Sequence, residues 1–219
     1  MTTFDLKRAK AHQRYRVNGS PVPGVTTVLG VIAKPALINW AWEQGMLGND
    51  FRKVRDTSAE IGTLAHSLIA DELRGVTETP MDTFTTEQVV FAEHCLTAWR
   101  SWREGKVLHP ALIEEQMVSE RYRYGGTIDI YGRLGRANEL IDLKTGGGIY
   151  DEYLAQLAAY RQLLIENGHT VKRARILRIG RTANEGWEER VITDFEPYWE
   201  LFAGALAVYN AQQKIRRGR

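Results

Sequence analysis

A chain of 219 residues can bury one sizeable core, and its 43% hydrophobic and 26% charged residues are typical of a globular protein. No apolar run approaches the roughly 20 residues that cross a bilayer. The single cysteine, Cys95, excludes an intrachain disulfide and a cysteine-rich zinc or iron–sulfur site within one chain. The N-terminus lacks the apolar segment of a signal peptide, so we expect a cytoplasmic protein with no membrane partner.

The net charge of +2 indicates no class of partner, but the charges are unevenly distributed. Residues 1–55 contain nine Lys/Arg and three acids, residues 172–181 contain five basic residues and no acid, and residues 214–219 contain four basic residues. Separate basic patches are compatible with a groove that binds a polyanion. A set of solvated surfaces and a frayed tail explains the same pattern, so charge suggests nucleic acid without establishing it.

Residues 14–20 predict a β-hairpin, because Asn18-Gly19 tolerates the positive φ of a tight turn. Thr26 and Thr27 then open a short helix that Pro35 limits. Residues 36–105 should be mostly helical, with helices over Ala36–Gly45, from Thr57 to about Leu73, and from Thr85 to about Glu104. The starts at Thr57 and Thr85 have capping-box spacing, and a glycine follows each of these two helices.

The second half of the chain alternates strands with helices. Predicted strands cover Ala111–Ser119, Thr127–Gly132, Glu139–Thr145, Lys172–Gly180 and Trp187–Ile192; predicted helices cover Asp151–Asn167 and the region after Pro197. This pattern predicts an α/β fold with a central mixed β-sheet flanked by helices and a helical N-terminal portion. We expect one domain over 1–219: a helical portion over 36–105, the sheet over 106–195, and a C-terminal helix with a basic tail over 196–219.

Acidic side chains mark the predicted hairpin between the second and third of these strands. Asp142 and Lys144 share one face of a strand, and the inferred register places Asp129 opposite Asp142. Directly opposed Cβ atoms lie about 4.5–5.5 Å apart, where two carboxylates repel each other. A divalent cation would reverse the sign of that interaction.

Carboxylate oxygens suit Mg²⁺ or Mn²⁺, which polarise a phosphate and acidify a bound water. Lys144 could orient that water or stabilise charge in the transition state. The alternative is a surface hairpin with an ordinary Asp–Lys pair, because an isolated DxK sequence is common.

Four motifs in order resemble those of RecB-type exonucleases of the PD-(D/E)XK nuclease superfamily. They are Gly62-Thr-Leu-Ala-His66 (GxxxH), Gly126-Thr-Ile-Asp129 (GxxD), Asp142-Leu-Lys144 (DxK) and Gln156-Leu-Ala-Ala-Tyr160 (QxxxY). Residues 14–45 also resemble, more loosely, phage-encoded and mitochondrial genome maintenance relatives. The resemblance implies a restriction-endonuclease-like core and a Mg²⁺- or Mn²⁺-dependent DNA exonuclease.

The resemblance also implies individual roles. His66, Asp129, Asp142 and the backbone carbonyl of Leu143 would hold the metal, and Lys144 would be the catalytic lysine. Gln156 and Tyr160, four residues apart on one helical face, would support the site or touch the DNA backbone.

Other candidates rest on less. Glu115 could add an acidic group, although Glu114 and Glu120 compete for that role. Arg173, Arg175 and Arg178 could guide DNA. Trp40 and Trp42 could stack on bases, although these tryptophans, with Trp99 and Trp102, could instead pack the helical portion against the sheet.

The expected activity is cleavage of single- or double-stranded DNA ends in recombination, repair or replication. A recombination or replication partner protein is possible, and a phage-encoded chain would act in the cytoplasm of its bacterial host. No iron–sulfur cluster is expected, because only Cys95 is present. The alternatives are a non-catalytic nucleic-acid-binding or scaffolding module on the same fold, and an endonuclease.

Overall fold

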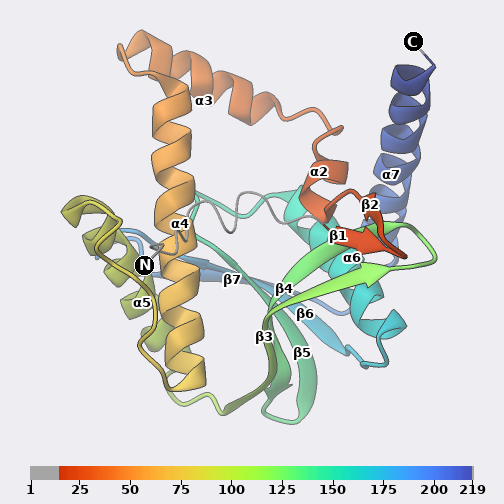
Figure 1. Cartoon of the computed structure of the whole chain (residues 1–219). Coiled ribbons are helices and arrows are strands. Elements are labelled where there is room, and N and C mark those ends of the chain that lie inside the picture. The colour runs from red at the N-terminus through yellow and green to blue at the C-terminus, as the bar shows by residue number, and fades with distance from the viewer. Residues whose placement is uncertain (1–14, 219) are drawn as a thin grey trace.

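The computed structural model describes residues 15–218, and five of its strands form one mixed sheet in the order β3-β4-β5-β6-β7 (Figure 1). These strands are β3 (Leu108–Ser119), β4 (Tyr124–Leu134), β5 (Ala137–Lys144), β6 (Arg173–Ile179) and β7 (Trp187–Ile192). Neighbours are antiparallel except β5 and β6, which run parallel and are connected through helix α6 (Asp151–Glu166). Parallel strands need such a crossover. The predicted α/β fold with a mixed sheet is confirmed.

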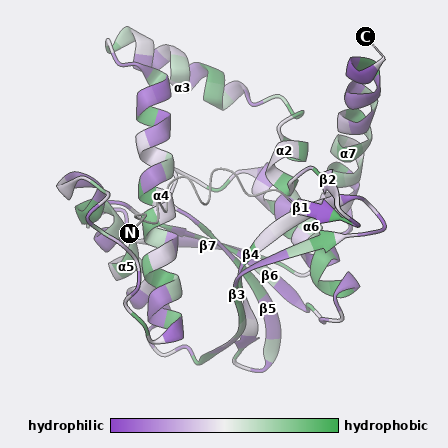
Figure 2. Ribbon diagram, in the orientation of Figure 1, coloured by the Kyte–Doolittle hydropathy of each residue, from purple (hydrophilic) through white to green (hydrophobic). Residues whose placement is uncertain are grey.

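Helices cover both faces of the sheet, and each face has its own hydrophobic cluster. The cluster that contains Leu140 includes residues of α2 (Val25–Leu29), α6 and α7 (Glu196–Arg217). The cluster that contains Ile141 includes residues of α4 (Phe51–Arg74) and α5 (Thr86–Arg103). Adjacent residues of β5 therefore face opposite sides, as strand geometry requires. In Figure 2, much of the α6 ribbon is green (hydrophobic), whereas the C-terminal end of α7 is purple (hydrophilic).

The N-terminal helices stand beside the sheet and extend beyond its end. Helix α3 (Pro35–Met46) crosses the top of Figure 1 between α2 and the far end of α4, and it contains no buried residue. Helix α5, in contrast, is anchored by Trp99 and Trp102, both fully buried, so the packing expectation is confirmed for this pair. Among the described residues, no helix is both long and apolar enough to cross a membrane.

Of the two predicted capping boxes, the one that begins α5 is confirmed and the one that was to begin α4 is wrong. The capping box of α5 is present: Thr85 Oγ1 accepts from the Gln88 amide, and the Gln88 side chain accepts from the Thr85 amide. Helix α4 instead begins at Phe51, where Asp50 is the N-cap and accepts from the Arg52 amide. The prediction of a start at Thr57 is wrong, because no helix breaker lies between 51 and 57 and an earlier cap was available.

Both predicted hairpins are present. Strands β1 (Tyr15–Val17) and β2 (Ser20–Val22) flank Asn18 and Gly19, which have φ of 50° and 76°. Strands β4 and β5 pair from Leu134↔Ala137 to Ile130↔Ile141, which is the predicted register. This pairing brings Asp129 and Asp142 to the next position along each strand.

Candidate metal-binding active site

Three carboxylates occupy one level of three adjacent strands. On β3, the pairs Ile113↔Ile130 and Glu115↔Ile128 bracket Glu114, so Glu114 lies across from Asp129 of β4. On the other side, Asp142 of β5 follows the last β4–β5 pair. There Asp129 Oδ2 accepts a hydrogen bond from the Leu143 amide at 2.8 Å. The sheet thus presents a row of acids where β4 and β5 stop pairing.

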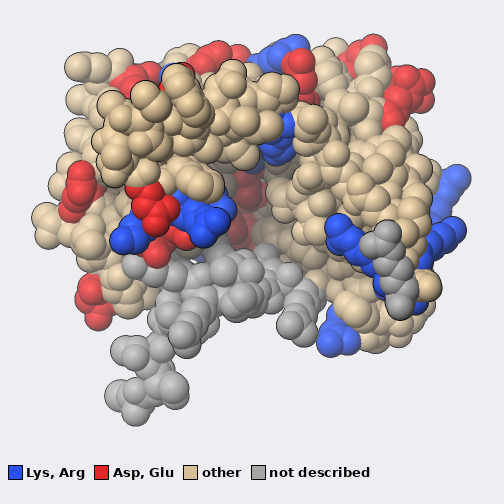
Figure 3. Space-filling model, turned by 90° about the horizontal axis from the view of Figure 1, so that it is seen from above, with Lys and Arg blue, Asp and Glu red and all other residues tan. Residues whose placement is uncertain are grey.

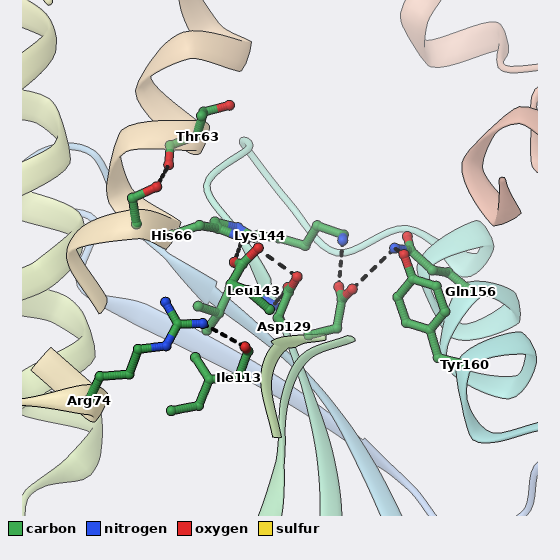
Figure 4. Close-up of polar contacts among 12 residues, drawn as sticks. Thr63, His66, Arg74, Ile113, Asp129, Leu143, Lys144, Gln156 and Tyr160 are labelled. Carbon is green, nitrogen blue, oxygen red and sulfur yellow. Dashed lines mark hydrogen bonds and ion pairs between the residues drawn. The ribbon is translucent and has the colours of Figure 1, made fainter. Parts of the chain in front are cut away.

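Helix α4 brings His66 to this row (Figure 4). His66 Nδ1 lies 3.5 Å from Glu114 Oε1 and 3.6 Å from Asp129 Oδ1. The helix can approach because a Cβ on Gly62 would lie only 3.0 Å from Thr145 Oγ1, just beyond the end of β5. The GxxxH spacing therefore places a small residue one turn before the histidine, at the close contact between helix and sheet.

The acid beside His66 is Glu114, and not the candidate Glu115. Glu115 is exposed, whereas the Glu114 side chain is 16% exposed and faces the site. The pairing of β3 with β4 shifts between Pro110 and Leu112, and Glu114 has a φ of 54°. A left-handed residue that is not glycine costs about 1–2 kcal/mol. Of the three competing acids Glu114, Glu115 and Glu120, the structure therefore brings Glu114 to His66. Pro110 within a strand was a sequence signal of an irregular β3.

The second part of the site lies against α6. Lys144 Nζ forms an ion pair with Asp142 Oδ2, and Gln156 Nε2 donates to Asp142 Oδ1 at 3.1 Å (Figure 4). Gln156 Nε2 also donates to the Tyr160 hydroxyl at 2.8 Å. A Cβ at Gly126 would lie 2.5 Å from the Tyr160 ring, so the glycine of the GxxD motif makes room for this tyrosine. Both residues are buried: Gln156 contacts Asp142 directly, and Tyr160 is connected to Asp142 through Gln156.

The charges of the site shift the pKa values of its groups. Burial opposes protonation of His66, but the nearby carboxylates of Asp129 and Glu114 outweigh it and raise its pKa to about 9. Burial raises the pKa of Asp142 to about 6, although the Lys144 ammonium opposes this rise. For Lys144, burial is outweighed by Asp142 and Asp129, so its pKa is raised and it is an ammonium at neutral pH. The carboxylates of the site therefore favour the positively charged forms of the groups beside them.

The same donor atoms fit a divalent cation. One imidazole nitrogen of His66 and one carboxylate oxygen each from Glu114 and Asp129 all lie within 4.8 Å of one another. Oxygen-rich sets of this kind suit Mg²⁺ and Mn²⁺. The structure brings the predicted ligands His66 and Asp129 together and adds Glu114. It places Asp142 beside this group, bound to Lys144 and Gln156. The Leu143 amide contacts Asp129, and a role for its carbonyl stays a prediction.

A pocket of about 420 Å³ opens beside His66, Glu114 and Asp129. Hydroxyl groups line much of it: those of Tyr15, Thr26, Thr27, Thr63, Thr127 and Tyr160. The Tyr15 hydroxyl and Thr127 Oγ1 lie 2.9 Å apart and join the N-terminal hairpin to β4. Figure 3 shows a hollow on this face of the molecule, with acidic (red) and basic (blue) side chains inside it. The pocket therefore leads from the surface to the candidate metal ligands.

The predicted DNA-guiding arginines lie on β6, away from the pocket lining. Arg175 is 7% exposed and forms ion pairs with Glu139 and Glu189, so it has no free surface to offer DNA, and that expectation is corrected. Arg173 also pairs with Glu139, although its side chain is 41% exposed. Arg178 is 12% exposed and pairs with two glutamates of the β6–β7 hairpin. A role of Arg173 and Arg178 in guiding DNA stays a prediction.

The tryptophans of α3 differ in exposure. Trp42 is 67% exposed, whereas Trp40 is half-buried. Neither lines the pocket beside His66. Their contact with bases stays a prediction.

Comparisons with known proteins give only distant similarities. No protein-family model matches the chain, and no curated protein matches it. Among solved structures, it is similar to the alkaline exonuclease LHK-Exo of Laribacter hongkongensis, at 14% identity and a TM-score of 0.45, over 88% of each chain. LHK-Exo in complex with dAMP gives 13% identity and a TM-score of 0.41, over 73% of this chain and 86% of that one. SSO0001 gives 15% identity and a TM-score of 0.30, over 53% and 59%. These similarities are too distant to assign a function.

Proposed function

We propose that this chain is a divalent-metal-dependent deoxyribonuclease that acts on DNA ends, of the RecB-type group within the PD-(D/E)XK superfamily. One observation carries the proposal. His66, Glu114 and Asp129 converge beside the Asp142–Lys144 pair and line a surface pocket. The four ordered sequence motifs support it independently, because each contributes a residue to this one place.

His66, Glu114 and Asp129 would hold Mg²⁺ or Mn²⁺. The bound ion would polarise the phosphate and lower the pKa of a water. The carboxylates of Asp142 and Asp129 raise the pKa of Lys144. In this proposal, the Lys144 ammonium is a donor that orients the attacking water or stabilises a phosphate oxygen as negative charge develops.

Asp142, Gln156 and Tyr160 control the position of that ammonium. Asp142 holds Lys144, while Gln156 fixes Asp142 and is itself bound to Tyr160. Tyr153 adds a second contact, because Lys144 Nζ lies 5.0 Å from the centre of its ring. In this proposal, Gln156, Tyr160 and Tyr153 are positioning residues, and Lys144 is catalytic.

The size and the lining of the pocket favour a free end as substrate. The pocket volume of about 420 Å³ falls in the range of about 300–1,000 Å³ typical of small-ligand sites, and it is lined by hydroxyls that can bind sugar and phosphate oxygens. Such a pocket suits a terminal nucleotide better than the side of an intact duplex. The expected settings are recombination, repair or replication, with DNA as the partner.

The test is digestion of end-labelled linear and circular DNA, single- and double-stranded, with Mg²⁺, Mn²⁺ or EDTA. We expect cleavage of linear DNA with metal, none with EDTA, and loss in Asp142→Asn. Asp82→Asn, which changes an exposed acid outside the site, is the matched control. Cleavage of circular DNA would establish the endonuclease alternative. Binding of DNA without metal binding or cleavage in any condition would leave the non-catalytic module.

A further inference from the structure

Glu114 lies in the site with its backbone outside the extended conformation of the strand. Its φ of 54° lies in the left-handed region, although it sits inside β3 with paired residues on both sides. A left-handed glutamate persists only where the surroundings impose it. Something in the fold must therefore hold the peptide group that precedes it.

Arg74 contacts that peptide group. Arg74, the last residue of α4, donates from one guanidinium nitrogen to the Ile113 carbonyl at 2.7 Å (Figure 4). This carbonyl belongs to the peptide bond that joins Ile113 to Glu114, and the orientation of that peptide plane sets the φ of Glu114. The hydrogen bond from Arg74 therefore joins α4, which supplies His66, to β3, which supplies Glu114.

We propose that Arg74 is a positioning residue that holds Glu114 in its left-handed conformation and thereby completes the metal site. This rests on the proposed metal-dependent function. Arg74 does not line the pocket, and its hydrogen bond to the Ile113 carbonyl acts on the backbone of Glu114. A charged donor suits the task, because it makes a stronger hydrogen bond to a carbonyl than a neutral donor does.

Loss of Arg74 should leave the fold intact. The Arg74 side chain is exposed, and α4 has a second polar attachment to the sheet region, where Arg181 donates to Ser58 Oγ, to the Ser58 carbonyl and to Thr145 Oγ1. The α4–α5 packing around buried Leu64 and Trp99 is also independent of Arg74. An effect on the metal site can therefore be separated from an effect on stability.

The experiment is Mn²⁺ titration by calorimetry, without DNA, combined with thermal unfolding of the metal-free protein. We expect Arg74→Ala to weaken Mn²⁺ binding about tenfold with a nearly unchanged metal-free Tm, and Arg74→Lys, which retains a donor, to recover part of the affinity. The matched control is Arg100→Ala, which removes another exposed arginine bound to α4, in this case through the Glu72 carboxylate. It should leave Mn²⁺ affinity within about twofold.

A double-mutant cycle gives the sharpest readout. In a Glu114→Gln background, Arg74→Ala should cause no further loss of Mn²⁺ affinity, because its effect passes through the Glu114 carboxylate. Equal losses in both backgrounds, or no loss from Arg74→Ala alone, would overturn the inference. Mn²⁺ binding that follows this cycle in a protein that cleaves no DNA would refute the nuclease and leave the role of Arg74 standing. A wild type that binds no Mn²⁺ would overturn both.

Discussion

Two groups of buried charges lie on the same sheet, and they are built in opposite ways. On β5, β6 and β7, Glu139 and Glu189 are matched by Arg173 and Arg175, with Arg175 bound to both glutamates. At the far end of β5, three carboxylates share Lys144 and His66. The first group neutralises itself, whereas the second retains acids that a cation would neutralise. A buried charge alone therefore does not indicate a functional site. An excess of buried charges of one sign, without enough opposite charges to neutralise them, does indicate one.

The first group, in which Glu139 and Glu189 pair with Arg173 and Arg175, is called the neutral group below. Breaking it should have the largest effect on stability. Arg175→Ala leaves Glu139, which is fully buried, with only the partly exposed Arg173. We expect a loss of about 3–5 kcal/mol in the free energy of unfolding, measured in urea, because a buried charge loses its partner. The double variant Arg175→Met/Glu139→Leu should recover most of that loss. An Arg175→Ala protein as stable as the wild type would show that this group contributes nothing.

Removing the ammonium from the acidic group should affect activity instead. Lys144→Ala should lower kcat about 10²–10³-fold with little change in KM, since a donor to developing charge is lost. The measurement is steady-state cleavage of end-labelled DNA with Mn²⁺. Lys106→Ala, which removes a lysine from the side of the sheet near Trp102 and Trp187, is the control. Equal losses in both variants would contradict a specific role for Lys144.

The smallest effect concerns the pH dependence of the neutral group. Partial burial would raise the pKa of Glu189, but hydrogen bonds from Trp102 and Arg175 outweigh it and lower the pKa below the ordinary 4.5. A lowered carboxyl pKa gives stability that is present above 4.5 and is lost as the pH falls through the folded value. Wild-type stability should therefore decline below about pH 4.5 more steeply than that of Glu189→Gln, in urea melts at stepped pH. Parallel declines would count against the contribution of Glu189.

Much of the site could be predicted because strand and helix periodicities place residues independently of the rest of the fold. The hairpin register brings Asp129 beside Asp142, DxK spacing puts Lys144 on the same face as Asp142, and the four-residue spacing in QxxxY aligns Gln156 with Tyr160. The structure has the predicted register and these contacts. Local geometry was sufficient for these residues.

The rest depends on structure that no local pattern encodes. Sequence alone left Glu114, Glu115 and Glu120 as competing acids, because it shows neither the shift in strand pairing near Pro110 nor the left-handed backbone of Glu114. Arg175 looked like surface charge, but its strand lies between two others, where a basic side chain needs acidic partners. Both points depend on tertiary context: the irregular pairing of one strand and the position of another in the sheet.

The most direct test of the account is Mn²⁺ titration of the DNA-free protein, by calorimetry and thermal unfolding, in the wild type, Asp129→Asn and Glu139→Gln. At 100 times Kd, binding should stabilise the wild type by about 2.7 kcal/mol. For a chain of this size, that corresponds to a rise in Tm of about 5–11 °C. We expect Asp129→Asn to lose this rise in Tm, whereas Glu139→Gln should keep the rise from a lower starting Tm. Equal rises in both variants, or no Mn²⁺ binding by the wild type, would contradict the claim that the acidic row is a metal site.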